Sequence, residues 1–292
     1  HANWAHLPAT SAWIASRLTG IPFSFSAHAG RDLFRTSALL RVKLRDASFA
    51  IACNDAARAR LIEAVGREAA HKVHVCYHGV DLERFQLRSE TDGAYLLSVG
   101  NLDAAKGFDV AVRSLTALRG RDVPYRIVGA GKERDALAAL AARLGLGAVV
   151  DLAGVLHGAQ LVEAYRGARV FLAPSRILPD GGRDGLPNVV LEAMAVGVPV
   201  VASNVAALPE AIVHERTGLL VASEDEAALS AAIVRLLDDR ELRERLVRAA
   251  RERVVRTFDR ARNVEHFCSF FESLPGLRAA SGSAIDPKQE AG

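Results

Sequence analysis

The segment from residue 95 to residue 221 alternates six short apolar stretches with stretches of helical periodicity. In chain order, the apolar stretches read YLLSVG, YRIVGAG, VVDLAG, VFLAPS, VPVVAS and GLLV. Stretches of this kind are typical of parallel strands buried on both faces, and the helical stretches between them connect one strand to the next. We therefore predict an α/β fold, with a complete Rossmann-like domain in this part of the chain.

The first 79 residues repeat this alternation on a smaller scale. Three apolar stretches, IPFSFSAH, ASFAIACN and KVHVCYHG, predict strands, and WAHLPATSAWIASRLTG predicts a helix that ends at Gly20. These elements make up about half of a doubly wound domain, and the chain begins at His1, inside sequence that looks folded. We interpret the chain as a fragment whose N-terminal domain is incomplete.

The pattern divides the chain into four parts. Hydrophobic periodicity lapses across VDLERFQLRSETDGA, where we place a hinge between two domains, and GLRAASGSAIDPKQEAG has the composition of a disordered tail. The predicted parts are a partial N-terminal Rossmann-like domain (1–85), a C-terminal Rossmann-like domain (86–260), a C-terminal helix that packs back toward the N-terminal domain (261–275) and the disordered tail (276–292).

Composition narrows the classes of function. The formal charge of +3 over 292 residues is too small to indicate a nucleic-acid-binding protein. The three cysteines lie far apart without a CxxC pair, which argues against a disulfide framework or a zinc site and favours a reducing cytoplasm. No apolar run reaches the roughly 18 residues of a membrane-spanning helix. We expect a cytoplasmic protein that binds no metal and no cofactor.

The loop after the first of the six predicted strands, SVGNLDAAKGFDV, carries a lysine in an unusual place. Gly100 allows a sharp turn after the strand, and Lys106 stands just before a helix. A helix N-terminus already carries about half a positive charge, so a lysine there is unfavourable unless an anion lies nearby. A bound phosphate would supply that anion. The alternative is an ordinary solvated lysine.

The stretch DGGRDGLPNVVLEAMAVGVPVV (180–201) combines a glycine-rich loop with an apolar helix. Pro187 suits a first helical turn, and the free amides of the helix start, at Asn188, Val189 and Val190, form a ready site for a diphosphate. Glu192, more than a turn further along, needs a partner such as the two hydroxyls of a ribose, and Asp184 could reach another hydroxyl group. An exposed pair of acids is the alternative interpretation.

Two further features are weaker. His28 ends a predicted strand and would face a cleft if the two halves oppose each other, although a lone histidine is more often a packing or capping residue. The stretch VGAGKER (128–134) looks like a dinucleotide-binding fingerprint but lacks the full GxGxxG pattern.

Taken in order, YHGVDLERF, SVGNLDAAKGFDVAV, YRIVGAGKERDAL, VFLAPS, RDGLPNVVLEAMAVGVPVVAS and LPEAIVHERTGLLV resemble the family 4 retaining glycosyltransferases of GT-B fold. The resemblance extends over nearly the whole chain to about residue 274, and it is strongest to bacterial enzymes of exopolysaccharide or colanic acid synthesis. It implies two Rossmann-like doubly wound domains, of which the N-terminal one is incomplete here because family members have about a hundred further residues ahead of His1.

The resemblance also implies roles for individual residues. Glu192 would bind the donor ribose, Lys106 the diphosphate, and Asp184 the hydroxyls of the transferred sugar, while His28 would lie beside that sugar. The implied catalytic residues are His28, Asp184 and Lys106. The implied donor-binding residues are Gly100, Asn101, Lys106, Asp184, Leu186, Pro187, Asn188, Val189 and Glu192.

Two positions depart from the family pattern. Asp184 stands where the family motif usually opens with Glu, which shortens the side chain by one methylene and could alter sugar preference. Asn101 replaces an Arg that commonly pairs with the diphosphate, so Lys106 and the helix amides must contribute more, or Arg176 or Arg183 substitutes.

The implied reaction moves a sugar from a UDP- or GDP-sugar to a saccharide or polyprenyl-linked acceptor, with retention at the anomeric carbon. We expect front-face attack without a covalent intermediate, because no carboxylate is clearly placed as a nucleophile. The alternatives are a GT-B nucleotide-sugar epimerase and a non-catalytic nucleotide-sugar-binding fragment. Basic residues at positions 31, 35, 41, 43 and 45 could contact anionic lipid on the inner face of the plasma membrane, or form a solvated helix face.

Overall fold

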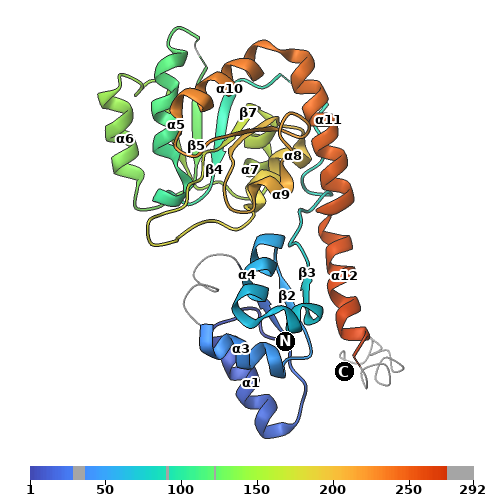
Figure 1. Cartoon of the computed structure of the whole chain (residues 1–292). Helices are drawn as coiled ribbons and strands as arrows, with labels where there is room; N and C mark the ends of the chain where they lie inside the picture. The colour runs from blue at the N-terminus through green and yellow to red at the C-terminus, as the bar shows by residue number, and fades with distance from the viewer. Residues whose placement is uncertain (29–36, 90–91, 122, 275–292) are drawn as a thin grey trace, which may run out of the picture.

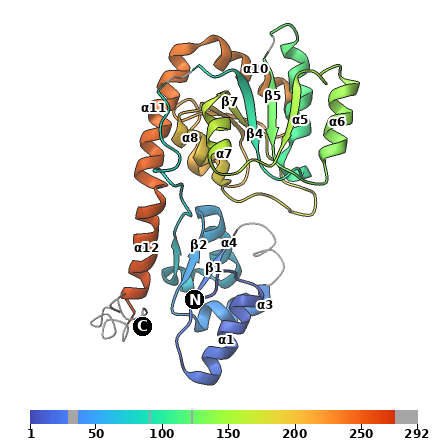
Figure 2. The ribbon, with the colours of Figure 1, turned by 180° about the vertical axis from the view of Figure 1, so that it is seen from behind.

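A computed structural model describes residues 1–28, 37–89, 92–121 and 123–274. The chain forms two halves, each built around its own parallel sheet, and two consecutive helices run along one side of both (Figure 1). The view from behind shows the same helices, α11 (Arg240–Thr257) and α12 (Arg260–Glu272), beside the C-terminal and the N-terminal half respectively (Figure 2). The predicted α/β class is confirmed.

The C-terminal half contains the six strands expected from the sequence. They follow the order β6-β5-β4-β7-β8-β9, and every neighbouring pair is parallel. The strand order reverses its direction at β4, so the loops after β4 and β7 meet at the switch point where α/β proteins bind ligands. The strands are β4 (Tyr95–Val99), β5 (Tyr125–Val128), β6 (Val150–Gly154), β7 (Ala168–Ala173), β8 (Val200–Ser203) and β9 (Leu219–Val221).

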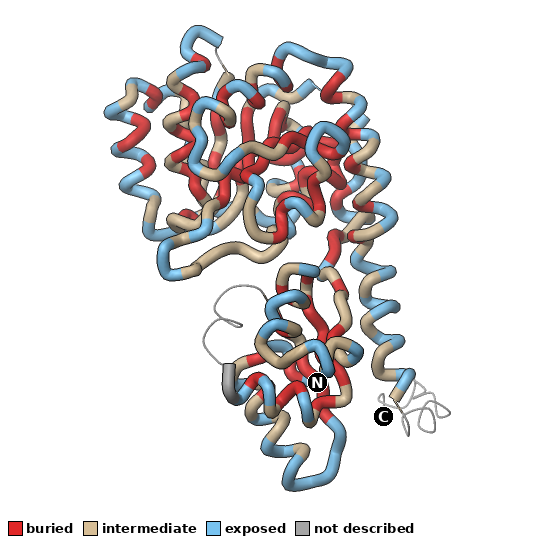
Figure 3. Tube along the Cα trace, viewed as in Figure 1, coloured by how far each residue is buried: buried red, intermediate tan, exposed pale blue. Residues whose placement is uncertain are grey.

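Two apolar layers enclose this sheet. Leu96, Val170 and Leu172 face one layer, whereas Leu97 and Phe171 face the other, because successive side chains of a strand point to opposite faces. Buried residues accordingly concentrate along the strands (Figure 3). The first layer is completed by α5 (Phe108–Ser114), η3 (Leu115–Leu118), α6 (Arg134–Arg143) and α10 (Glu226–Asp238), and the second by α7 (Gly158–Arg166), α8 (Asn188–Val196), α9 (Leu208–Ala211) and α11.

The N-terminal half holds a three-stranded parallel sheet in the order β1-β2-β3. Helix α12 packs on one face of this sheet. Its contacts join Phe267, Phe270 and Phe271 to Phe49 and Ile51. The predicted disordered tail, 276–292, lies outside the described residues. The elements of this half are α1 (Leu7–Thr19), β1 (Phe25–Ala27), α3 (Ser37–Asp46), β2 (Ala50–Ala52), α4 (Asp55–Val65), η1 (Arg67–Lys72) and β3 (Val73–Val75), and η2 (Ala104–Lys106) lies in the other half.

One helix end agrees with its sequence signal and one charged residue does not. As expected, α1 ends at Gly20, which adopts a left-handed conformation with φ of 74°. Lys43, expected on a solvated or lipid-facing surface, is buried, and its ammonium group donates hydrogen bonds to the carbonyl groups of Ala5 and His6. That expectation is wrong for Lys43. Residues 31 and 35 lie outside the described ranges.

Among the described residues, none of the helices combines the length and the apolar character that crossing a bilayer requires.

The chain passes between the halves twice, and the two crossings are bonded to each other. The Val80 amide donates to the Phe258 carbonyl at 2.8 Å, and the Arg260 amide donates to the Val80 carbonyl at 3.0 Å. Gly79 is needed here, since a Cβ atom at this position would lie 2.8 Å from the Phe258 oxygen and its φ is 72°. The described structure therefore connects the halves through a paired backbone rather than one free linker.

We expect Gly79→Ala to lower the free energy of unfolding by roughly 2–4 kcal/mol, because it combines a left-handed conformation with a steric overlap. Gly145→Ala is the matched control: its φ is 68°, but its Cβ would meet nothing within 4 Å. The control should cost only about 1 kcal/mol. Urea denaturation of both variants measures the difference, and equal losses would contradict the close approach at Gly79.

Candidate active site

The loops that carry the predicted donor-binding residues meet at the carboxyl ends of β4 and β7. Lys106, from the loop after β4, and Pro187 and Val189, from the start of α8, line one small cavity together with the ends of both strands. Parallel strands place the loops that follow them at the same edge of the sheet, which brings residues some 80 positions apart into one site.

Lys106 and Asp184 form an ion pair. The Lys106 Nζ atom lies 2.7 Å from Asp184 Oδ2, and only 15% and 26% of the two side chains are exposed. Gly100 provides the space for this lysine, because a Cβ atom at position 100 would stand 3.1 Å from Lys106 Cε. The pair satisfies both charges within the protein, so an anionic ligand has to compete with Asp184 for the ammonium group.

The N-terminus of α8 points into the same region without a side-chain cap. Pro187 occupies the N-cap position, and among the described residues no side chain bonds the amides of the first turn. The Val190 amide, predicted to be free, donates to the Pro187 carbonyl at 3.1 Å. The Asn188 and Val189 amides have no acceptor in the part of the chain that the structure describes, and the helix dipole favours negative charge there. An uncapped helix start beside a lysine has the chemistry of a phosphate-binding site.

Glu192, on the second turn of α8, is half-buried and bonds a tyrosine. The hydroxyl group of Tyr165 in α7 donates to Glu192 Oε2 at 2.7 Å. Burial raises the pKa of Glu192, although the Tyr165 hydrogen bond and the positive charge of Arg84 oppose that shift. Burial, followed by the charge of Glu192, also raises the pKa of Tyr165 well above its ordinary value. Tyr165 therefore stays a donor, and Glu192 keeps acceptor capacity for a further hydroxyl group.

His28 lies across from α8 at a cavity of about 150 Å³ between the halves. Its Nε2 atom lies 2.7 Å from the Asn3 carbonyl oxygen, which can only accept, so Nε2 carries a proton. The His78 ring lies 5.0 Å from the His28 ring. The cavity is lined by His28, Cys53, Asn54, Tyr77 and His78 from the N-terminal half and by Gly185, Leu186, Asn188 and Leu191 from the C-terminal half.

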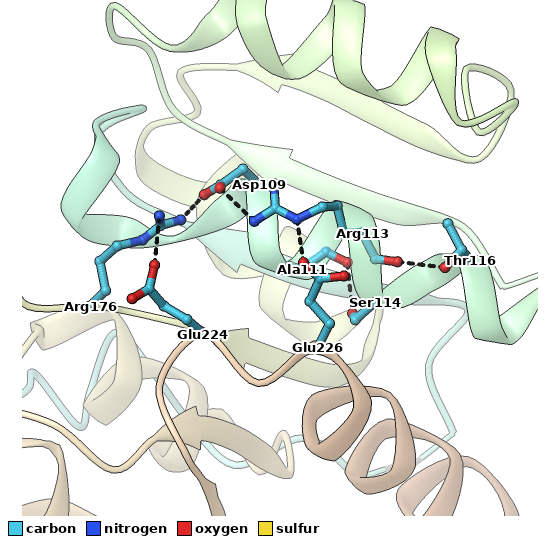
Figure 4. A network of polar contacts seen from close by, with 8 residues as sticks. All are labelled: Asp109, Ala111, Arg113, Ser114, Thr116, Arg176, Glu224 and Glu226. Carbon is cyan, nitrogen blue, oxygen red and sulfur yellow. Dashed lines mark hydrogen bonds and ion pairs between the residues drawn. The ribbon is translucent and has the colours of Figure 1, made fainter.

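Arg176, considered as a substitute for the missing arginine at position 101, is held by other acidic residues. It forms ion pairs with Asp109 and with Glu224, the latter at 3.2 Å, and Arg113 joins the same network through Asp109 and Glu226 (Figure 4). Its charge is thereby partnered within the protein. The side chain of Asn101 is exposed, and Arg183 Nε donates to the Gly181 carbonyl at 3.3 Å.

The glycines of VGAGKER have a packing role. A Cβ atom at Gly129 would lie 1.9 Å from the Gly100 oxygen, and one at Gly131 would lie 2.3 Å from the Leu102 oxygen. These glycines let the loop after β5 approach the loop that carries Lys106.

Several residues of the site were not predicted from the sequence. Tyr165 lies inside an ordinary amphipathic helix, and Asn54, Tyr77 and His78 follow strands of the N-terminal half. The position of these last residues after strands was the available signal. Tyr165 had no such signal, because only packing brings α7 beside α8. In the described residues, no cluster of three or more potential metal ligands is present.

Residues 80–253 match the family described as Glycosyl transferases group 1, which is more than half of the chain. The chain belongs to this family. The resemblance inferred from the motifs is thereby confirmed. The matched segment of this group 1 glycosyltransferase chain begins at the paired crossings and contains Lys106, Asp184 and Glu192, whereas His28 lies outside it.

Two bacterial relatives carry exopolysaccharide names. WcaL of Salmonella typhimurium, named for colanic acid biosynthesis, is 32% identical over 209 residues, which cover 70% of this chain and 52% of WcaL. The amylovoran biosynthesis glycosyltransferase AmsK of Erwinia amylovora is 34% identical over 173 residues, covering 57% and 42% of the two chains. The chain thus spans about half the length of the curated relatives it matches.

Solved structures share the fold. HepE of Anabaena, crystallised with UDP, superposes with a TM-score of 0.81 and 22% identity, covering 91% of this chain and 76% of HepE. Sucrose-phosphate synthase of Thermosynechococcus elongatus gives a TM-score of 0.80 and 24% identity over 95% of this chain and 73% of the synthase. The predicted GT-B arrangement of Rossmann-like domains is confirmed.

We expect the stability of Glu192→Gln, measured relative to the unmodified chain, to be greater at high pH than at low pH. A carboxyl group whose folded-state pKa is raised contributes stability that is present below its unfolded pKa and is lost as the pH rises through the folded pKa. The amide removes that loss and still accepts from Tyr165. Thermal unfolding of both chains at pH 5 and pH 8 measures this difference, with Glu163→Gln, at an exposed carboxylate, as the control. A difference in stability that moves against the variant between pH 5 and pH 8 would contradict the prediction.

Proposed function

We propose that this chain binds a nucleoside-diphosphate sugar and that the protein containing it transfers the sugar to a saccharide acceptor. The observation that carries the proposal is the arrangement of Lys106, Asp184 and the uncapped start of α8, with Glu192 on the next turn. One nucleotide sugar running along α8 would meet a carboxylate, a set of amides with a lysine, and a second carboxylate, in that order.

Each of these groups suits one part of the donor. Glu192 accepts from the ribose hydroxyls, because its burial, which also raises its pKa, removes solvent and makes the carboxylate more dependent on a donor. Lys106 and the α8 amides stabilise the negative charge that develops on the departing diphosphate, the largest expected contribution to catalysis. Asp184 accepts from hydroxyls of the transferred sugar, and His28 approaches the same sugar from the N-terminal half.

Retention is proposed to proceed by front-face attack. The acceptor oxygen bonds the anomeric carbon as the bond to the diphosphate oxygen breaks, and that oxygen takes the acceptor proton. Asp184, the carboxylate proposed to contact the sugar, is paired with Lys106, which makes it a poor nucleophile. A covalent glycosyl-enzyme trapped on a side chain would overturn this route.

The acceptor is proposed to be a growing, lipid-linked exopolysaccharide precursor, which the exopolysaccharide names of WcaL and AmsK support. Contact with a membrane surface would bring the protein to such an acceptor. Arg41 and Arg45 are the described residues of the basic segment that keep a surface position after the burial of Lys43.

Calorimetric titration tests donor binding. The HepE crystals hold UDP or UDP-glucose, so UDP is the first nucleotide to titrate, with GDP beside it. We expect one of them to bind the chain and Glu192→Gln to weaken it roughly 10- to 100-fold, the usual effect of losing hydrogen bonds to a charged group. Binding of neither nucleotide to the chain would contradict the proposal for this chain.

Asp184→Asn separates the two roles of the loop. It frees Lys106, so we expect UDP to bind up to about tenfold more tightly, while turnover of the UDP-sugar falls because a sugar contact is lost. Asp180→Asn removes the same charge from the same loop without contacting Lys106 and should change neither value. Equal behaviour of the two variants would show that the ion pair does not control the donor site.

A further inference from the structure

Glu210 joins the two halves through its side chain, although it lies outside the donor site. It belongs to α9, on the side of the C-terminal half that faces α4 (Figure 1). Its Oε2 atom accepts from the Asp55 amide at 2.8 Å, and its Oε1 atom accepts from the Ala56 amide at 2.9 Å. The Tyr77 hydroxyl group donates to Oε2 at 3.0 Å. A carboxylate from one half thus caps a helix of the other.

This contact satisfies groups that would otherwise lack partners. The first amides of α4 have no acceptor within the helix, and Asn54 Oδ1, at the N-cap, accepts from the Ala57 amide at 2.7 Å. Glu210 accepts from the two amides before it. The carboxylate also lies at the positive end of the α4 dipole, so charge and hydrogen bonding act together.

Tyr77 strengthens the contact from the crossing segment. Burial, followed by the charge of Glu210, raises the pKa of Tyr77 above its ordinary value, so the hydroxyl group keeps its proton and remains a donor. The same hydroxyl group lies 3.2 Å from Asp55 Oδ2. The Glu210 backbone is held in turn by Arg253 of α11, which donates to its carbonyl oxygen. Glu210 is therefore anchored on both sides of the contact.

The contact adjoins the cavity between the halves. Asn54, which bonds the Ala57 amide, and Tyr77, which bonds Glu210, line that cavity. They lie beside His28 and His78. The opposite wall consists of residues from the loop and first turns of α8. The distance between the two walls depends on how the halves are held, and Glu210 supplies side-chain hydrogen bonds that hold them next to the cavity.

We propose that Glu210 is a positioning residue for the transfer reaction: by capping α4 it holds the wall that carries His28 and His78 against the donor-binding helix α8. This role rests on the proposed function. The donor-binding residues inferred for the nucleotide all lie in the C-terminal half, so nucleotide affinity does not depend on the contact. Turnover needs both walls and does depend on it.

Hydrogen exchange tests the contact directly. Glu210→Gln leaves one acceptor oxygen and turns an NH₂ group toward the second amide, so exchange at Asp55 and Ala56 should speed up by about tenfold or more. Tyr77→Phe should leave these amides protected, since it removes only the third donor. Glu244→Gln, which alters an exposed ion pair within α11, is the control and should change nothing.

Titration with UDP and hydrolysis of UDP-glucose to UDP then test the role. We expect Glu210→Gln to bind UDP within about twofold of the unmodified chain, and to release UDP from UDP-glucose at least about tenfold more slowly at saturation. Unchanged exchange at Asp55 and Ala56 would overturn the contact. Faster exchange with unchanged turnover would overturn the positioning role. So would a loss of UDP affinity as large as the loss of turnover.

The two proposals fail in different ways. If the unmodified chain binds no UDP and releases none from UDP-glucose, the proposed function fails for this chain and the positioning role fails with it. The exchange rates at Asp55 and Ala56 still decide whether Glu210 caps α4, because that readout needs no nucleotide.

Discussion

The pairing of the two backbone crossings, Val80 with Phe258 and Arg260, is the constraint on which the arrangement of this molecule depends. A single linker would let each half rotate freely, whereas two crossings bonded in register leave few relative orientations. Phe258 is fully buried beside them, and its ring lies 4.8 Å from that of Tyr77. The same segment leads from α11 into α12, so the helix that covers the N-terminal sheet continues from the C-terminal half.

This frame explains why polar contacts between the halves can be few and still be specific. Glu210 reaches α4, and Arg260 pairs with Asp81 at 2.8 Å near the crossings. Side-chain bonds of this kind contribute little when both partners are free to move, since ordering them costs entropy. Here the paired backbone crossings have already ordered these partners, so each contact adds to an arrangement that it does not have to hold alone.

The donor site shows charges that are partnered internally but not ideally. Glu192 shares one hydrogen bond with Tyr165 while burial opposes its charge, and Lys106 is neutralised by Asp184. Such groups lower the stability of the unliganded fold relative to apolar residues, and a ligand that replaces lost solvation recovers that free energy. The site is therefore arranged to exchange partners, which agrees with binding an anion that carries hydroxyl groups.

Two disagreements between prediction and structure have different physical causes. The helix that the sequence predicts after Lys106 does not continue in one form, because it changes from α5 to the 3-10 helix η3 at Leu115. Ser114 Oγ donates to the Ala111 carbonyl and Thr116 Oγ1 donates to the Arg113 carbonyl, so side chains compete for the helical acceptors there. Lys43 is misplaced for a different reason: its acceptors at Ala5 and His6 belong to another helix start, which no local pattern of charges reveals.

The sequence by itself determined the succession of strands and helices along the chain and the loops that follow the strands, because periodicity and turn residues act over a few positions. Its motifs carried the resemblance to the family. Only the tertiary structure decided which charge meets which partner. Glu192 meets Tyr165, Lys106 meets Asp184, and Glu210 meets the first amides of α4, although Glu210 and Asp55 are 155 residues apart in the sequence. Such contacts depend on how helices pack across a sheet and across two crossings, and packing of that range leaves no periodic trace in the chain.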